Sequence, residues 1–236
     1  NLTLNDPASS LKLNGVAEVS KVLISADNTT GKLEIAQDSI IETLSHSGSS
    51  RIDIADTKTL TLNNAFEIPA GKSMELPGAG GGTLSLADKL TLSGTLKVNA
   101  ADTIKDGTLS LKGGTLEVSQ DASIASVMLH EANLDGHDWT GMSLLTVHFQ
   151  ECSLKSNIFN FCKMQTTGFH DCNMEQCQFE NLDSEYSRFY KARLEKSNFR
   201  QAELKGAQFT ESSIDFVDFS EADLSKSVVM GCSAKK

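Results

Sequence analysis

The fold is decided by the stretch Ala192-Arg-Leu-Glu-Lys196, Ser197-Asn-Phe-Arg-Gln201, Ala202-Glu-Leu-Lys-Gly206, Ala207-Gln-Phe-Thr-Glu211, which repeats one five-residue pattern four times. Each unit begins with a small residue and carries a large apolar anchor at its third position. Followed outward in both directions, this register holds from Val127 to Ala234. A period of five fits neither a helix, with about 3.6 residues per turn, nor a lone strand, with about two. A fixed period sustained over this length indicates a repeat architecture.

The anchors separate by side-chain type when they are grouped at intervals of twenty residues. Two groups consist almost entirely of aromatic residues, and the two groups between them consist mainly of leucine and methionine. This separation predicts a coil of four units whose core contains two ladders of stacked rings. The predicted core ladder comprises Trp139, Phe149, Phe159, Phe169, Phe179, Phe189, Phe199, Phe209 and Phe219. Ser184 is the one polar anchor, and Leu182 beside it takes over the volume, which leaves room for a local bulge.

Two units, Ala132-Asn-Leu-Asp-Gly136 and Ala222-Asp-Leu-Ser-Lys226, match the five-residue consensus A(D/N)LXX outright. On these residues and the anchors, positions 127–234 resemble the pentapeptide-repeat family. The resemblance implies a right-handed, four-sided β-helix with four units per coil. It implies little about activity, because this family is functionally mixed and a fold does not determine a function.

The first part of the chain has a different composition, with all three prolines and repeated apolar–polar–apolar triplets such as Leu84-Ser-Leu86 and Leu96-Lys-Val98. Such triplets are typical of short half-buried strands. Several recur about 20 residues apart, as from Leu96 to Leu116, which favours a looser β-solenoid over the alternative, an antiparallel sandwich. Before residue 55 the pattern sets no register. We therefore predict an all-β chain of two stacked parallel β-solenoids, residues 1–125 and residues 126–236.

The formal net charge of −10 argues against nucleic acid or an anionic membrane as a direct partner. No apolar run approaches the roughly 18 residues of a membrane-spanning helix. All five cysteines take the small inward position of their units, which predicts packed free thiols in a reducing compartment, either bacterial cytoplasm or a host cell after translocation. The sequence shows no pattern of a catalytic nucleophile or metal centre, so neither an enzyme nor a cofactor is predicted.

Two outward features are candidate binding surfaces. Acidic residues fill eight of ten positions in two adjacent outward columns, which we name the acidic edge: Glu131, Asp135, Glu151, Asp171, Glu175, Glu195, Glu211 and Asp215. Like charges stacked at strand spacing are destabilising, so the columns are either a solvated face or a surface for a basic partner. The second feature is apolar and consists of Ile158 and Phe161, which flank the inward Phe159. Tyr186, Tyr190, Phe216 and Met230 are also outward, and are interpreted as scattered surface residues.

The sequence favours a non-catalytic, rigid scaffold for protein–protein interaction, with a protein partner that it does not identify. Solenoids need capped ends, and the terminal Gly231-Cys-Ser-Ala-Lys-Lys236 offers no cap, so a further domain or end-to-end association is expected. The resemblance extends to bacterial effectors, in which such a rod is the binding portion. Two alternatives stay open. One is an acidic DNA mimic that inhibits or protects DNA gyrase, and the other is a structural shaft or spacer.

Overall fold

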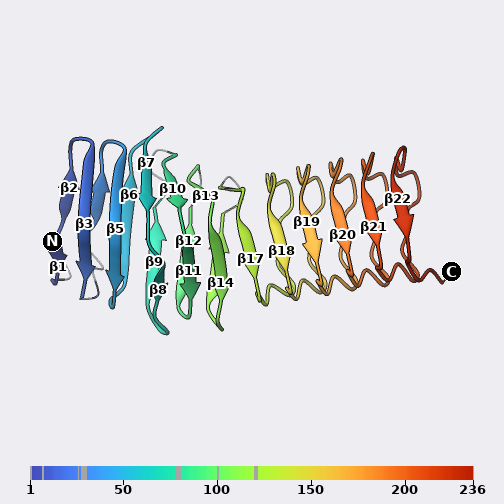
Figure 1. The fold of residues 1–236 in the computed structure, drawn as a ribbon, viewed down its shortest axis with the longest axis horizontal. Helices are drawn as coiled ribbons and strands as arrows, with labels where there is room; N and C mark the ends of the chain where they lie inside the picture. Colours follow the sequence, from blue (N-terminus) through green and yellow to red (C-terminus); the bar gives the residue numbers. More distant parts are fainter. Residues whose placement is uncertain are drawn as a thin grey trace. The chain divides into compact units, whose positions relative to one another are not determined.

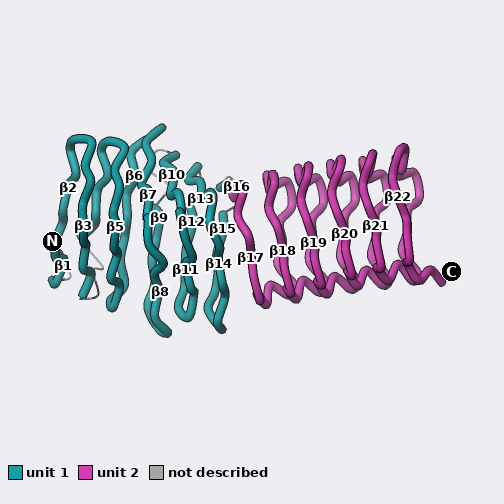
Figure 2. The backbone as a smooth tube through the Cα atoms, in the orientation of Figure 1, with its two compact units in different colours: residues 1–123 teal, residues 124–236 magenta. Residues whose placement is uncertain are grey.

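The computed structural model describes residues 2–6, 8–25, 27, 31–77, 81–99, 101–119 and 122–235. Throughout these ranges the secondary structure consists of strands, bridges and turns, without a helix. Consequently, the described residues contain no helix long and apolar enough to cross a membrane. The chain divides into two compact units, Asn1–Ser123 and Ile124–Lys236, where the sequence predicts a boundary after residue 125 (Figure 2).

The first unit is a parallel β-solenoid with three runs of stacked strands (Figure 1). One run contains β1 (Leu2–Leu4), β3 (Ala17–Ile24), β5 (Ser39–His46), β7 (Thr59–Leu62), β10 (Thr83–Leu86) and β13 (Thr103–Lys105). A second contains β2 (Leu11–Leu13), β4 (Leu33–Ile35), β6 (Ser50–Ile54), β9 (Ser73–Leu76), β12 (Thr95–Val98) and β15 (Thr115–Val118). The third contains β8 (Phe66–Ile68), β11 (Lys89–Leu92) and β14 (Thr108–Leu111). A further strand, β16 (Ser123–Ala125), lies at the boundary of the units.

All of these strand pairs are parallel, which excludes the antiparallel sandwich. The predicted twenty-residue register is confirmed where Leu84 pairs with Ile104 and Leu96 with Leu116. Earlier coils are unequal, since Leu33 pairs with Ile52 but Ser50 pairs with Met74. Turns of different length between the strands produce this variation. It explains why the apolar triplets set no register before residue 55.

A polar pair lies inside the first unit, where β5 leads into β6. His46 Nε2 and Ser50 Oγ are 2.7 Å apart, and both residues are buried. His46 Nδ1 has no hydrogen-bond partner among the described residues. Because burial penalises the charged imidazolium, the pKa of His46 is lowered from 6.5 to about 4, with Asp27 acting weakly in the opposite direction. His46 is therefore neutral at pH 7.

The second unit is a four-sided parallel solenoid with twenty residues per coil. One side carries three-residue strands: β17 (Met128–His130), β18 (His148–Gln150), β19 (Gly168–His170), β20 (Arg188–Tyr190), β21 (Gln208–Thr210) and β22 (Val228–Met230). The other three sides are held by single parallel bridges, such as Asn133 to Ser153, Asp138 to Ile158 and Ser143 to Lys163. This confirms four units per coil, while the right-handed sense stays a prediction.

Two aromatic ladders occupy the core of the second unit. Phe149, Phe169, Phe189 and Phe209 stack with ring centroids 4.7–5.1 Å apart. Trp139, Phe159, Phe179, Phe199 and Phe219 stack at 4.3–6.1 Å. The ladders also meet edge-to-face, for example Phe189 and Phe199 at 87°. Offset-parallel and edge-to-face contacts are the favourable aromatic geometries, so each ring is stabilised along its ladder and across the core.

The polar anchor Ser184 leaves the coil regular and introduces no bulge, because Asp183 bridges both Lys163 and Glu203 in register. Its hydroxyl is buried without a hydrogen-bond partner among the described residues. Ser187, three residues later, is also buried, but its hydroxyl donates to the Met164 carbonyl at 2.7 Å. A hydrogen bond thus offsets the cost of burying the hydroxyl at Ser187, whereas none does so at Ser184.

This difference predicts opposite effects of the same substitution. Ser184→Ala removes an unsatisfied buried hydroxyl and is expected to raise the free energy of unfolding by about 1 kcal/mol. Ser187→Ala removes a hydroxyl that hydrogen-bonds and is expected to lower it by about 1 kcal/mol. Urea unfolding of the second unit, followed by the fluorescence of Trp139, measures both. Shifts of the same sign would contradict the assignment of Ser184 as unsatisfied.

Candidate functional site

The outward side chains of the second unit are presented by a turn that recurs every five residues. The residue two positions after an anchor has a positive φ, as at Glu131 (53°), Glu151 (55°) and Asp171 (52°). Hydrogen bonds that span four residues close many of these turns, such as Cys162 N–H to the Phe159 carbonyl at 3.2 Å. A positive φ at the third residue of such a turn is the mark of type II. We call these positions the corners.

Three corners carry large exposed aromatic residues, namely Phe161, Tyr186 and Phe216, each with φ of 59°. They are 60%, 53% and 54% exposed, respectively. A left-handed conformation is unfavourable for bulky residues, and glycine or asparagine is the usual occupant. Neither core packing nor turn propensity therefore explains these three rings. Tyr186 and Phe216, interpreted from the sequence as scattered surface residues, share this turn position with Phe161, but the three lie on different corners of the twenty-residue coil.

The predicted apolar pair is only half exposed. Phe161 extends into solvent, but Ile158 is half-buried and lies in the bridge column between Asp138 and Gln178. Phe161 is thus the one exposed member of the pair.

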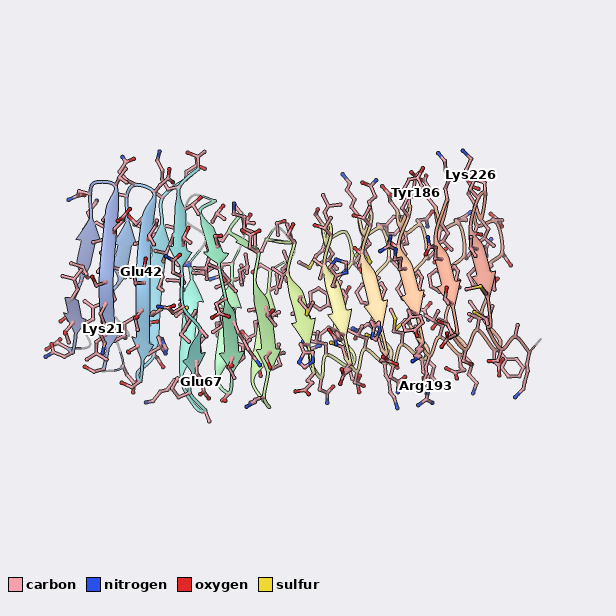
Figure 3. The ribbon with its side chains drawn as sticks, in the orientation of Figure 1. Lys21, Glu42, Glu67, Tyr186, Arg193 and Lys226 are labelled. Atoms are coloured by element: carbon pink, nitrogen blue, oxygen red, sulfur yellow. The ribbon has the colours of Figure 1, made fainter. Side chains whose placement is uncertain are left out.

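The acidic edge is not a continuous negative surface, because basic side chains pair with some of its carboxylates. Three of its members form ion pairs with arginine or lysine. Arg193 pairs with Glu175 and with Glu195, and Lys235 Nζ lies 3.4 Å from Asp215. Figure 3 shows Arg193 and Tyr186 at opposite ends of the strands of this unit. Exposed ion pairs contribute little to stability, but here they reduce the charge that the edge presents.

The predicted exposure of Asp215, a member of the acidic edge, is wrong. It was expected to face solvent, but only 9% of the residue is exposed. Its carboxylate accepts a hydrogen bond from Lys235 N–H at 2.9 Å in addition to the contact with the lysine ammonium. Asp135 also has local partners, since it accepts from Ser153 Oγ at 2.7 Å and from Lys155 N–H at 2.8 Å.

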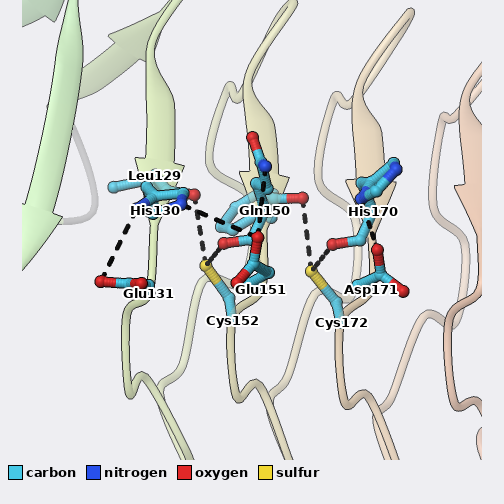
Figure 4. A network of polar contacts seen from close by, with 10 residues as sticks. Leu129, His130, Glu131, Gln150, Glu151, Cys152, His170, Asp171 and Cys172 are labelled. Atoms are coloured by element: carbon cyan, nitrogen blue, oxygen red, sulfur yellow. Dashed lines mark hydrogen bonds and ion pairs between the residues drawn. The ribbon is translucent and has the colours of Figure 1, made fainter.

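Histidines contact the other end of the edge (Figure 4). His170 Nδ1 lies 2.8 Å from Asp171, and the two nitrogens of His130 each lie 3.9 Å from one carboxylate, Glu131 or Glu151. The ligand-type atoms of His130, Glu131 and Glu151 fall within 4.8 Å of one another. Structural zinc sites use four ligands, and this cluster offers one fewer.

The cysteines of the second unit are free thiols packed against main-chain carbonyls. Cys152, Cys162, Cys172 and Cys177 are buried and free, whereas Cys232 is half-buried. Cys152 and Cys172 donate to the carbonyls of Leu129 and Phe149 at 3.2 and 3.3 Å (Figure 4). Burial raises the pKa of Cys162 and of Cys177 to about 12. Because the thiolate is the nucleophile, these two thiols are inert at pH 7.

A groove of about 570 Å³ lies on the outer side of β17–β20. Its lining includes His148, Arg188 and Tyr190 from the strands and Tyr186 from a corner. The groove opens where Gly168 takes the outward position that Met128, His148 and Arg188 fill on neighbouring strands. The sequence contained this signal, because positions 128, 148, 168 and 188 differ by twenty residues. Charge and apolar character, which define the two predicted surfaces, do not reveal a missing side chain.

Comparison with models of known protein families identifies the type of repeat. Residues 153–229 match the model of the pentapeptide repeat region. The chain contains a pentapeptide repeat region. Its described residues show the parallel coil and the inward anchors that the resemblance implies.

Solved structures similar to the chain include other proteins with pentapeptide repeats. HetL, a protein involved in heterocyst differentiation regulation from the cyanobacterium Nostoc sp. strain PCC 7120, is 11% identical, with 98% of this chain and 90% of HetL covered and a TM-score of 0.48. Rfr23 from the cyanobacterium Cyanothece 51142 is 14% identical, with coverages of 48% and 86% and a TM-score of 0.27. A trypsin-treated form of QnrB1, a plasmid-mediated fluoroquinolone resistance protein, is 13% identical, with coverages of 75% and 91% and a TM-score of 0.32. The search of curated proteins found no match.

Proposed function

We propose that the chain is a non-catalytic scaffold whose pentapeptide repeat region binds a protein partner through aromatic corner residues. The observation that carries the proposal is the placement of Phe161, Tyr186 and Phe216 at left-handed corners. The left-handed conformation recurs at every corner, so the exposed aromatic side chain distinguishes these three corners from the others. Exposed aromatic residues are also enriched at the centres of protein interfaces.

The chemistry of the buried groups supports a non-catalytic role. The serine–histidine pair of the first unit, Ser50 and His46, is buried at both members, so a substrate has no access to it. The raised pKa values of Cys162 and Cys177 argue against thiol catalysis by these two residues. Buried free thiols also support the proposal that the protein acts in a reducing compartment, either bacterial cytoplasm or a host cell that receives it as an effector.

The acidic edge motivates a second candidate, the DNA mimic that binds gyrase. Eight carboxylates in two columns favour it, but the cationic side chains of Arg193 and Lys235 lie against three of them. A mimic needs a continuous negative field, so these contacts make the aromatic corners the better-supported surface.

The test compares the intact protein with two variants in pull-downs from bacterial and host-cell lysates. The first replaces Phe161, Tyr186 and Phe216 with asparagine, which tolerates the left-handed conformation and so preserves the turns. The second reverses the charge at Glu151, Asp171, Glu175 and Glu195.

We expect the first variant to lose a protein that the second still captures. Gyrase captured by the intact protein and lost only by the charge-reversed variant would replace this proposal with the DNA mimic. Identical capture profiles from all three proteins would leave the structural shaft as the function.

A further inference from the structure

The groove over β17–β20 has the dimensions of a ligand site. Its volume of about 570 Å³ falls within the range of roughly 300–1,000 Å³ that is typical of small-molecule sites. Gly168 leaves a gap in an outward column that otherwise carries Met128, His148 and Arg188, and the imidazole of His148 lies over the glycine. The floor is rigid, since the strands beneath it are fixed by the stacked rings of Phe149 and Phe169.

The charge of the groove is opposite to that of the chain. The described residues that line it include no aspartate or glutamate, although the chain has a net charge of −10. Arg188 is exposed and has no ion pair or side-chain hydrogen bond within the described ranges. By contrast, Arg193 and Arg200 contact carboxylates, Glu175 and Glu221. A guanidinium binds carboxylate and phosphate oxygens in a bidentate manner, so Arg188 is a ready site for an anion.

Planar and apolar groups surround this cation. Tyr186 is 53% exposed and lines the groove, and its ring lies over the corner glycine Gly206, whose added Cβ would be 2.6 Å from Tyr186 Cδ1. Tyr190 packs against His170 at a ring distance of 4.9 Å. Aromatic walls beside a guanidinium favour a ligand that combines a flat ring with a negative charge.

We propose that the groove binds a small organic anion with an aromatic ring, its charged group on Arg188 and its ring on Tyr186. This goes beyond the proposed protein-binding function, because the ligand is a small molecule and the site is on one face of the coil. Carboxylate and phosphate groups share the chemistry that Arg188 recognises, and the experiment distinguishes them.

The test uses phenyl phosphate and benzoate as anionic probes and benzyl alcohol as the neutral counterpart. Each is titrated into the full chain, and binding is followed by the shifts of the tyrosine and histidine NMR signals. We expect at least one anion to show saturable binding. Benzyl alcohol should bind about tenfold more weakly than that anion, because it lacks the charge-assisted hydrogen bond to Arg188. Tighter phenyl phosphate assigns a phosphate site, and tighter benzoate assigns a carboxylate site.

Two variants with the same change of charge provide the control. Arg188→Gln is expected to weaken the better anion about tenfold. Arg193→Gln removes an arginine that pairs with Glu175 outside the groove and should leave the affinity unchanged. If both variants weaken anion binding equally, the effect depends only on net charge. Equal binding of inorganic phosphate alone would show an adventitious ion only. Either result would overturn the proposal, as would equal binding of benzyl alcohol.

A third variant fills the space without changing the charge. Gly168→Met supplies the side chain that Met128 carries at the equivalent position, and the φ of Gly168 lies outside the left-handed region. An added Cβ would lie 2.5 Å from His148 Nδ1, so the imidazole must turn away. Binding of both anions should be lost. Unchanged binding by a folded Gly168→Met protein would contradict the site, and if this variant fails to fold, the comparison of Arg188 with Arg193 decides.

Discussion

Replacing Phe179 with alanine is expected to lower the free energy of unfolding of the second unit by about 3–5 kcal/mol, the usual cost of truncating a buried phenylalanine. Phe179 is fully buried and stacks on Phe159 and Phe199, with centroid distances of 5.2 and 4.3 Å. The coils above and below are fixed by the same ladder, so the cavity has little freedom to collapse. Urea unfolding followed by the fluorescence of Trp139, the single tryptophan, reports on this ladder directly.

The matched control is Phe161→Ala, the same substitution at an exposed corner of the same coil. Since Phe161 is 60% exposed, we expect a change within about 0.5 kcal/mol. A Phe179→Ala protein as stable as this control would show that ladder stacking does not hold the coils together. The pair of variants also separates the roles of phenylalanine in this chain, because Phe161 is proposed to bind a partner and Phe179 to stabilise the solenoid.

Acidification is expected to destabilise the first unit through His46. The pKa of His46 is about 4 in the folded state and 6.5 in the unfolded reference, so between these values the unfolded chain binds more protons than the folded one. Stability must then fall as the pH falls from 6.5 to 4, by about 2 kcal/mol at pH 5 and about 3 kcal/mol at pH 4. Circular dichroism during urea unfolding at pH 7 and pH 5 measures the loss, with Trp139 fluorescence reporting separately on the second unit.

His46→Gln is the control for this pH dependence. Glutamine retains an amide at the position from which His46 Nε2 reaches Ser50, and it does not titrate. Carboxylates contribute to acid sensitivity in both proteins, so the difference between their pH profiles isolates the histidine. If the two profiles run parallel from pH 7 to pH 5, His46 is not neutral in the folded chain.

The fold of the second unit could be predicted from the sequence because each inward residue depends only on its position within a period of five. Phe149 and Phe169 are separated by twenty residues, and they stack with an interplanar angle of 7°. Coil lengths in the first unit could not be predicted in the same way. Loops of different length separate Ser50 from its partner Met74 and Leu33 from Ile52, and apolar triplets contain no information on loop length.

The surface was harder to predict than the core for a physical reason. Outward columns assign each residue to a corner or a side, but long side chains cross from one column to another. Arg193 belongs to a column of small polar residues and still reaches Glu175. Asp215 is covered within its own column, because Lys235, one coil later, donates its N–H to the carboxylate and places its ammonium 3.4 Å away. The acidic edge was therefore predicted in position but not in effective charge.

The twenty-residue coil of the second unit has a consequence for how such a chain can change in length. Phe149, Phe169 and Phe189 occupy equivalent positions, so the gain or loss of one whole coil keeps every anchor directed inward and every turn at its corner. The gain or loss of a single residue would instead move outward side chains into the inward positions along the rest of the repeat. Insertions and deletions in this region should thus accumulate during evolution in multiples of a coil, while exposed side chains vary independently of the backbone.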